Sequence, residues 1–70
     1  MSLTKEMMMS VENDIKSYNN EDLLNYYTSY KALNTAYPNS FYYYRASKSL
    51  EEIYRRGIEN EIKETKTLYR

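Results

Sequence analysis

The sequence predicts an all-α fold dominated by an antiparallel helical hairpin, and three observations carry this prediction. The 70 residues include one glycine and one proline, so the residues that punctuate turn-rich β folds are scarce. Apolar side chains recur at spacings of three and four residues in three segments. Residues suited to helix N-termini stand near the start of each segment. A chain of this length holds one small domain with a thin core, which we assign to residues 1–70.

The first segment, residues 1–18, is predicted to form an amphipathic helix. Four apolar side chains recur at every fourth position on one face: Leu3, Met7, Val11 and Ile15. Ser2 or Thr4 is suited to cap its N-terminus. Two roles for this face stay open: it packs across the hairpin, or it forms an interface with a second copy in a homo-oligomer such as a dimer.

The second segment, residues 20–37, is predicted to be the first arm of the hairpin. Asn19 is a suitable N-cap, and Glu21 and Asp22 complement the positive end of the helix dipole. The apolar face is broad and rich in tyrosine. Pro38 ends the helix, because a residue that precedes proline is disfavoured in the α conformation.

The third segment, residues 39–69, is predicted to be the second arm of the hairpin, with Asn39 or Ser40 as its cap. Gly57 has two interpretations: the left-handed residue that ends a helix, or a destabilising glycine inside a longer one. The apolar stripe continues through Ile58 and Ile62. We therefore expect one long helix that bends near Gly57.

The composition argues against an enzyme. The chain has no cysteine and no histidine, which removes the thiol nucleophile, the commonest general base and the commonest metal ligands. The paired glutamates, such as Glu51 and Glu52, have basic residues one helical turn away and are expected to form a solvated, salt-bridged face. No cofactor or metal is expected. No stretch predicts a membrane span or a signal peptide, so a cytoplasmic protein is expected.

Charge is distributed unevenly along the chain. Residues 1–22 hold two basic and five acidic residues, residues 23–50 hold three basic residues and no acid, and residues 51–70 hold five of each. The middle stretch also contains seven of the ten tyrosines. Tyrosine and arginine are enriched at binding hot spots. We therefore predict a protein-binding surface made of Tyr26, Tyr30, Lys31, Tyr42, Tyr43, Tyr44, Arg45 and Lys48.

Two alternatives to a protein-binding surface remain. Any of these tyrosines is equally suited to fill the core in place of leucine or phenylalanine. Nucleic-acid binding is the second alternative, with residues 21–36 and 40–56 as a helix-turn-helix whose reading face is Tyr42, Arg45, Lys48 and Ser49. Three positive charges are few for contact with a phosphate backbone, so this class is less favoured.

Three short motifs resemble a known family. They are Glu21-Asp22-Leu23-Leu24, Tyr30-Lys31-Ala32 and Glu52-Ile53-Tyr54-Arg55-Arg56. This pattern is similar to the Sda-type small helical hairpins, sporulation-checkpoint inhibitors of a histidine kinase, over about half of the chain. Similar hairpins occur among phage and prophage proteins. The resemblance implies a non-catalytic inhibitor that docks on a host enzyme or regulatory protein, of phage or mobile-element origin.

Overall fold

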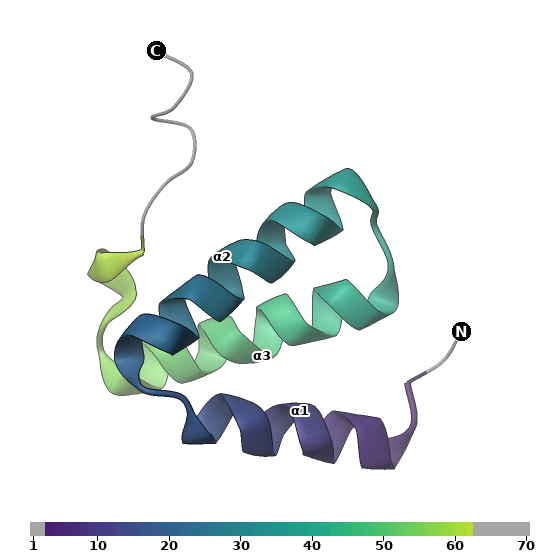
Figure 1. Cartoon of the computed structure of the whole chain (residues 1–70), viewed down its shortest axis with the longest axis horizontal. Helices are drawn as coiled ribbons and strands as arrows, with labels where there is room; N and C mark the ends of the chain where they lie inside the picture. Colours follow the sequence, from purple (N-terminus) through teal and green to yellow (C-terminus); the bar gives the residue numbers. More distant parts are fainter. Residues whose placement is uncertain (1–2, 63–70) are drawn as a thin grey trace.

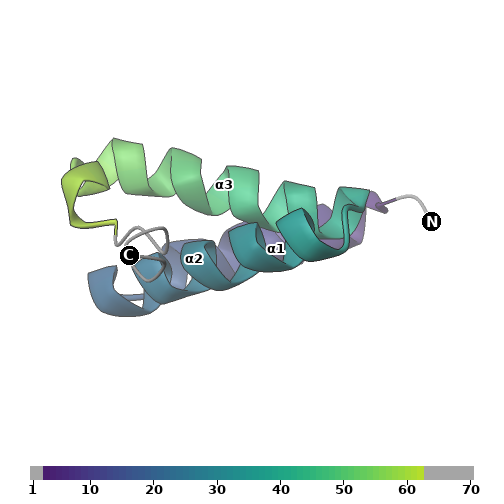
Figure 2. The same cartoon turned by 90° about the horizontal axis from the view of Figure 1, so that it is seen from above.

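The computed structural model describes residues 3–62, which form three α-helices and one short 3₁₀ helix: α1 (Lys5–Ser17), α2 (Asn20–Ala36), α3 (Ser40–Arg56) and η1 (Glu59–Glu61). Helices α2 and α3 form an antiparallel hairpin, and α1 runs below α3 in the view of Figure 1. Seen from above, α3 lies at one level, and α1 and α2 lie at another, on the same side of α3 (Figure 2). The predicted all-α hairpin with an additional N-terminal helix is confirmed.

Each of the three α-helices begins at a side-chain cap that was among those the sequence predicted. The Oγ1 atom of Thr4 accepts a hydrogen bond from the backbone N–H of Met7 at 3.1 Å. The Oδ1 atoms of Asn19 and Asn39 accept from backbone N–H groups three residues further on, at 2.8 and 2.9 Å. These bonds satisfy N–H groups that have no partner within the helix, and they set where each helix starts.

We expect the Asn39→Ala variant to lose about 1 kcal/mol of unfolding free energy. The Asn39 side chain caps α3 and also donates from Nδ2 to the carbonyl oxygen of Tyr37 at 3.0 Å, so it fixes the hairpin turn as well. Urea unfolding followed by far-ultraviolet circular dichroism measures the loss. Asn25→Ala, at an exposed position inside α2, is the matched control and is expected to cause no loss. An equal effect of the two substitutions would contradict the role of Asn39 in capping.

The predicted continuation of the third helix through Gly57 is wrong, because α3 ends at Arg56. Gly57 adopts φ +74°, a left-handed conformation that only glycine enters without steric cost. Its N–H donates to the carbonyl of Tyr54, and the N–H of Ile58 donates to the carbonyl of Ile53, which is the Schellman pattern of a helix end. Residues 63–69 of the predicted helix, like residues 1 and 2, lie outside the described residues.

The apolar residues beyond Gly57 belong to the core instead of to a continued helical stripe. After the left-handed turn the chain reverses, so that Ile58 is buried in the core and Ile62 packs against it. A straight helix would carry both side chains onward along its axis, away from α1 and α2. The apolar residues Ile58 and Ile62 therefore pack in or against the core, as their spacing suggested. The chain brings them to the core by turning at Gly57, and not by continuing the helix.

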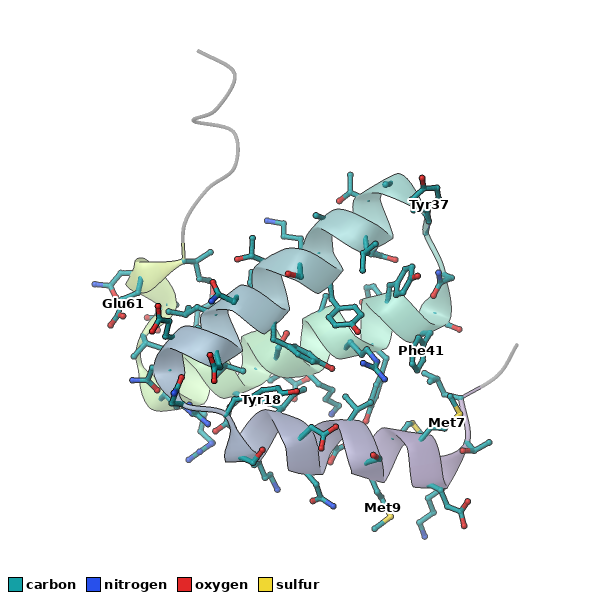
Figure 3. The ribbon with its side chains drawn as sticks, viewed as in Figure 1. Met7, Met9, Tyr18, Tyr37, Phe41 and Glu61 are labelled. Carbon is teal, nitrogen blue, oxygen red and sulfur yellow. The ribbon has the colours of Figure 1, made fainter. Side chains whose placement is uncertain are left out.

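The hydrophobic core joins all three helices and the turn that follows them. Its buried members are Val11, Ile15, Leu23, Tyr27, Ile53 and Ile58. Two residues predicted for an oligomer interface, Val11 and Ile15, are therefore used inside the single chain and are not available to a second copy. The other two, Leu3 and Met7, are half-buried. Figure 3 shows Met7 near the N-terminal end of α1 and Met9 pointing away from the hairpin.

Candidate functional site

Five aromatic side chains form a continuous row of ring contacts. We call these five residues and Arg45 the aromatic face. The row runs through Tyr18, Tyr26, Tyr30, Tyr42 and Phe41, with ring centroids 5.3, 4.8, 5.9 and 6.3 Å apart in that order. The rings are tilted by about 45° to one another, a favourable arrangement for aromatic pairs. All five side chains are half-buried. Figure 3 shows Tyr18 and Phe41, the two ends of the row.

The helices bring these rings together from three parts of the chain. Tyr26 and Tyr30 are four residues apart on α2, so they lie one turn apart on the same side of that helix. The antiparallel hairpin places Tyr42, in the first turn of α3, against Tyr30. Tyr18 joins them because it ends α1 in an extended conformation, with φ −74° and ψ 144°.

Arg45 lies between two members of the row. Its Cζ atom is 4.2 Å from the ring centroid of Phe41 and 5.1 Å from that of Tyr30. Its Nη1 atom also donates a hydrogen bond to the Tyr30 hydroxyl at 2.9 Å. A guanidinium over an aromatic ring is attracted to the negative face of the π system. These contacts hold the cation in one orientation within the aromatic face.

Arg45 also acts on the ionisation of Tyr26, another member of the aromatic face. Burial raises the pKa of Tyr26, and the positive charge of Arg45 opposes that rise without cancelling it. Arg45 is the one basic residue among the six members of the face, which contains no acid. The face combines a large area of half-exposed ring surface with one fixed positive charge.

The structure separates the other predicted binding residues from this face. Tyr44 points toward α1, where its hydroxyl donates a hydrogen bond to the Oε2 atom of Glu12. Burial, with the Glu12 bond as the second cause, raises the pKa of Tyr44 to about 12. The Nζ atom of Lys48 lies 5.7 Å from the Tyr44 ring and 3.5 Å from a carboxylate oxygen of Glu51. This group supports the contact between α1 and α3.

Tyr43 and Lys31 lie apart from both groups. Tyr43 is 64% exposed, and Lys31 lies on α2 with its Nζ atom 5.8 Å from the Tyr27 ring. The eight predicted residues therefore occupy several places, and only Tyr26, Tyr30, Tyr42 and Arg45 come together. The prediction missed Tyr18 and Phe41. The four-residue spacing from Phe41 to Arg45 was a usable signal, whereas Tyr18 lies in the acidic N-terminal stretch and gave none.

The residues predicted to be the reading face of a helix-turn-helix do not form a single exposed surface, so that prediction is wrong. Ser49 is fully buried, and its hydroxyl donates to the backbone carbonyls of Arg45 and Ala46 at 2.8 and 2.9 Å. Tyr42 is part of the aromatic row, and Lys48 faces Glu51. These side chains do not present one surface to a groove of duplex DNA.

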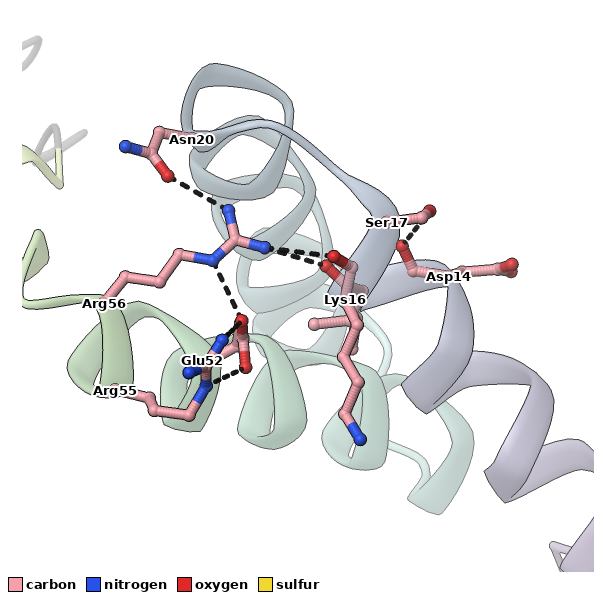
Figure 4. A network of polar contacts seen from close by, with 8 residues as sticks. Asp14, Lys16, Ser17, Asn20, Glu52, Arg55 and Arg56 are labelled. Carbon is pink, nitrogen blue, oxygen red and sulfur yellow. Dashed lines mark hydrogen bonds and ion pairs between the residues drawn. The ribbon is translucent and has the colours of Figure 1, made fainter.

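A second cluster of polar side chains surrounds Glu52, which is buried with 7% exposure (Figure 4). Its carboxylate accepts hydrogen bonds from the Nε atoms of Arg55 and Arg56, at 2.8 and 2.9 Å. The Arg55 bonds hold the pKa of Glu52 at about 2, against the opposing effect of burial. Of these two ion pairs, Glu52–Arg56 has the four-residue spacing from which the sequence predicted a salt bridge, whereas Glu52–Arg55 was not predicted. The expectation that Glu52 lies on a solvated face was wrong.

Arg56 extends this cluster to the other two helices. Its Nη1 atom donates to the Oδ1 atom of Asn20 at 3.0 Å, and its Nη2 atom donates to the carbonyl of Lys16 at 3.4 Å (Figure 4). Arg56 therefore ties the end of α1 and the start of α2 to α3. Because its groups are occupied by one another, the cluster stabilises the fold and offers no free acid or base for catalysis.

Three further findings concern the class of site: metal binding, membrane insertion and similarity to known proteins. Among residues 3–62, no three acidic side chains gather closely enough to hold a metal ion. In the same part of the chain, the helices lack the combined length and apolar character needed to cross a membrane. No protein-family model, curated protein or solved structure matches this chain. The aromatic face is therefore the candidate site that the geometry offers.

Proposed function

We propose that the protein is a non-catalytic regulator that binds another protein through the aromatic face. The observation that carries the proposal is the row of five half-buried rings with the guanidinium of Arg45 over two of them. Tyrosine and arginine are the side chains most enriched at binding hot spots. Rings that already contact one another lose little conformational freedom when a partner covers them, which favours affinity.

The resemblance to the Sda-type hairpins supports the same class of function. Several residues that carry it are core residues: Leu23 and Ile53 are fully buried, and Glu52 is nearly so. The resemblance therefore bears most directly on the hairpin that holds the aromatic face. A host enzyme or regulatory protein is the proposed target, in keeping with a phage or mobile-element origin.

A pair of tyrosine substitutions on α3 tests the proposal. Tyr42 belongs to the aromatic face, whereas Tyr54 is 60% exposed and has no ring contact among the described residues. Tagged wild-type, Tyr42→Ala and Tyr54→Ala proteins are recovered from source cells after chemical cross-linking, and captured proteins are quantified. The Tyr42→Ala protein is expected to capture the partner at least about tenfold less than the other two.

Folding is the control for this experiment, because Tyr42 also contacts other rings. Both variants should keep the helical circular-dichroism signal of the wild-type protein at the temperature of the capture. Equal recovery of the same partner by all three proteins, with the fold intact, would refute the aromatic face as the binding surface.

Binding to duplex DNA would point to a different class of function. We expect no shift in the mobility of duplex DNA at near-physiological ionic strength, because the aromatic face holds a single cation, Arg45, and Lys48 faces Glu51, too few positive charges for a phosphate backbone. A salt-dependent shift under those conditions would favour the nucleic-acid class over a protein-binding regulator.

A further inference from the structure

We propose that Arg45 is an anchor for an aspartate or glutamate side chain of the partner, carried on a segment whose apolar residues cover the aromatic rings. This inference rests on the proposed function and specifies the chemistry of the partner. It follows from the pairing of Arg45, from its orientation and from the charge of the surrounding chain.

The first observation is that Arg45 forms no ion pair with any of the residues that the structure describes. Residues 3–62 contain three ion pairs, Lys48–Glu51, Arg55–Glu52 and Arg56–Glu52, and Arg45 is in none of them. Its Nε atom is buried without a hydrogen-bond partner among the described residues, and Nη1 donates to the hydroxyl of Tyr30. A guanidinium has five N–H donors, and its contacts with tyrosine hydroxyls leave the positive charge without a carboxylate partner in this part of the chain.

Arg56 shows how the same fold treats another largely enclosed guanidinium. Its three nitrogens donate to the Glu52 carboxylate, the Asn20 side chain and the backbone carbonyls at the end of α1. A charge that is withdrawn from water without such pairing is unfavourable. Arg56 therefore shows that arginines in this fold are not generally left without polar partners. The contrast identifies Arg45 as an incomplete binding site.

The second observation is that the orientation of Arg45 is already fixed. The rings of Phe41 and Tyr30 flank its guanidinium, at 4.2 and 5.1 Å from Cζ. A carboxylate matches the planar fork of a guanidinium and forms a short, charge-assisted hydrogen bond with it. Since the side chain is held before the partner arrives, less conformational entropy is lost on binding.

The third observation is charge complementarity. Residues 23–50, which contribute Tyr26, Tyr30, Phe41, Tyr42 and Arg45 to the face, contain no acid, and Arg45 is the basic residue of this stretch that lies in the face. This stretch attracts an acidic segment and repels a basic one. A free inorganic anion would use Arg45 but leave five half-exposed rings uncovered, so a polypeptide with one acid among apolar residues fits the face better.

Selection from a phage-displayed library of random 12-residue peptides tests the inference. The baits are the immobilised wild-type chain, Arg45→Gln, and Lys31→Gln as a matched removal of one positive charge outside the face. We expect the wild-type and Lys31→Gln proteins to enrich peptides with an aspartate or glutamate at a constant position beside apolar residues. The best synthetic peptide should bind Arg45→Gln at least tenfold more weakly than either.

A double-substitution cycle then assigns the contact. Converting the peptide's acid to its amide should weaken binding to the wild-type protein at least tenfold and should have little further effect on Arg45→Gln. Circular dichroism checks that Arg45→Gln is folded. If Arg45→Gln unfolds, the Arg45→Lys variant replaces it, because lysine keeps the positive charge but lacks the planar pair of N–H donors, and binding should still be weaker. The amide peptide can also be tested on the wild-type chain without any substitution in the protein.

The outcomes separate this inference from the proposed function. Peptides that need Tyr42 but show no acidic preference would overturn the role of Arg45 and leave the aromatic face as the binding surface. Peptides that bind Tyr42→Ala and Arg45→Gln as well as they bind the wild-type protein would overturn both proposals. Failure of the wild-type chain to enrich any peptide would also count against both.

Discussion

The Ile53→Ala variant is expected to lose about 2 to 5 kcal/mol of unfolding free energy. Ile53 is 0% exposed and lies in the core cluster where residues of α1, α2, α3 and the turn after α3 meet. Removing three carbons there leaves a cavity that rigid neighbours fill only in part. A domain of 70 residues has little stability in reserve, so much of the variant is expected to be unfolded near 37 °C.

Thermal and urea unfolding measure this loss, and the next residue supplies the control. Tyr54 is 60% exposed, so Tyr54→Ala is expected to change the free energy of unfolding by less than about 1 kcal/mol. Both substitutions truncate a side chain at neighbouring positions of α3 and differ in burial. Comparable losses for the two variants would contradict the position of Ile53 in the core.

The second large effect is expected from Glu52→Gln, with a loss of about 2 to 3 kcal/mol. The substitution removes the carboxylate charge that Arg55 and Arg56 share, while it nearly preserves side-chain shape. Arg56 is then left largely enclosed without its counter-ion, and the link from α3 to α1 and α2 is weakened. Arg55 is mostly exposed, so water screens its part of the interaction.

The same carboxylate predicts how stability depends on pH. The pKa of Glu52 is about 2 in the folded protein, compared with 4.5 for an unperturbed glutamate. Because the folded pKa is lowered, the stabilisation is fully present above about pH 4.5 and is lost as the pH falls toward 2. The loss is about 2 kcal/mol after allowance for the exposed Arg55. Glu52→Gln should show a correspondingly flatter pH dependence over this range.

Glu51→Gln is the matched control for both measurements. Glu51 precedes Glu52 on α3 but is exposed, and its contact with Lys48 is long, at 3.5 Å. Its removal is expected to change stability by less than about 0.5 kcal/mol and to leave the pH dependence between 2 and 4.5 close to that of the wild-type protein. If Glu52→Gln behaves like Glu51→Gln, the buried ion pairs do not contribute to stability as inferred.

The helices of the described residues were largely predictable because their starts depend on local interactions. A cap needs one polar side chain and an N–H group three residues away, and Thr4, Asn19 and Asn39 stand at those positions. The end of α3 was harder to predict, since Gly57 fits both a helix end and a bend. Burial of Ile58 favours the turn, and that burial depends on α1 and α2 being present.

The candidate site was predictable in composition but not in arrangement. Tyr42, Tyr43 and Tyr44 are neighbours in the sequence, yet successive side chains on a helix point about 100° apart. Tyr42 therefore joins the aromatic row, Tyr43 faces solvent and Tyr44 reaches Glu12 on α1. Tyr18, from a stretch of opposite charge, entered the face because the turn after α1 brings it against Tyr26.

The sequence by itself determined the helical class, the three helix starts and the concentration of tyrosine and positive charge in the middle of the chain. These properties follow from local backbone preferences and from composition. Tertiary packing places Val11 and Ile15 in the core, buries Glu52, and sets Arg45 over two rings with no ion pair among residues 3–62. Each of these depends on which helix faces lie against one another, a matter of long-range packing that periodicity along one chain does not specify.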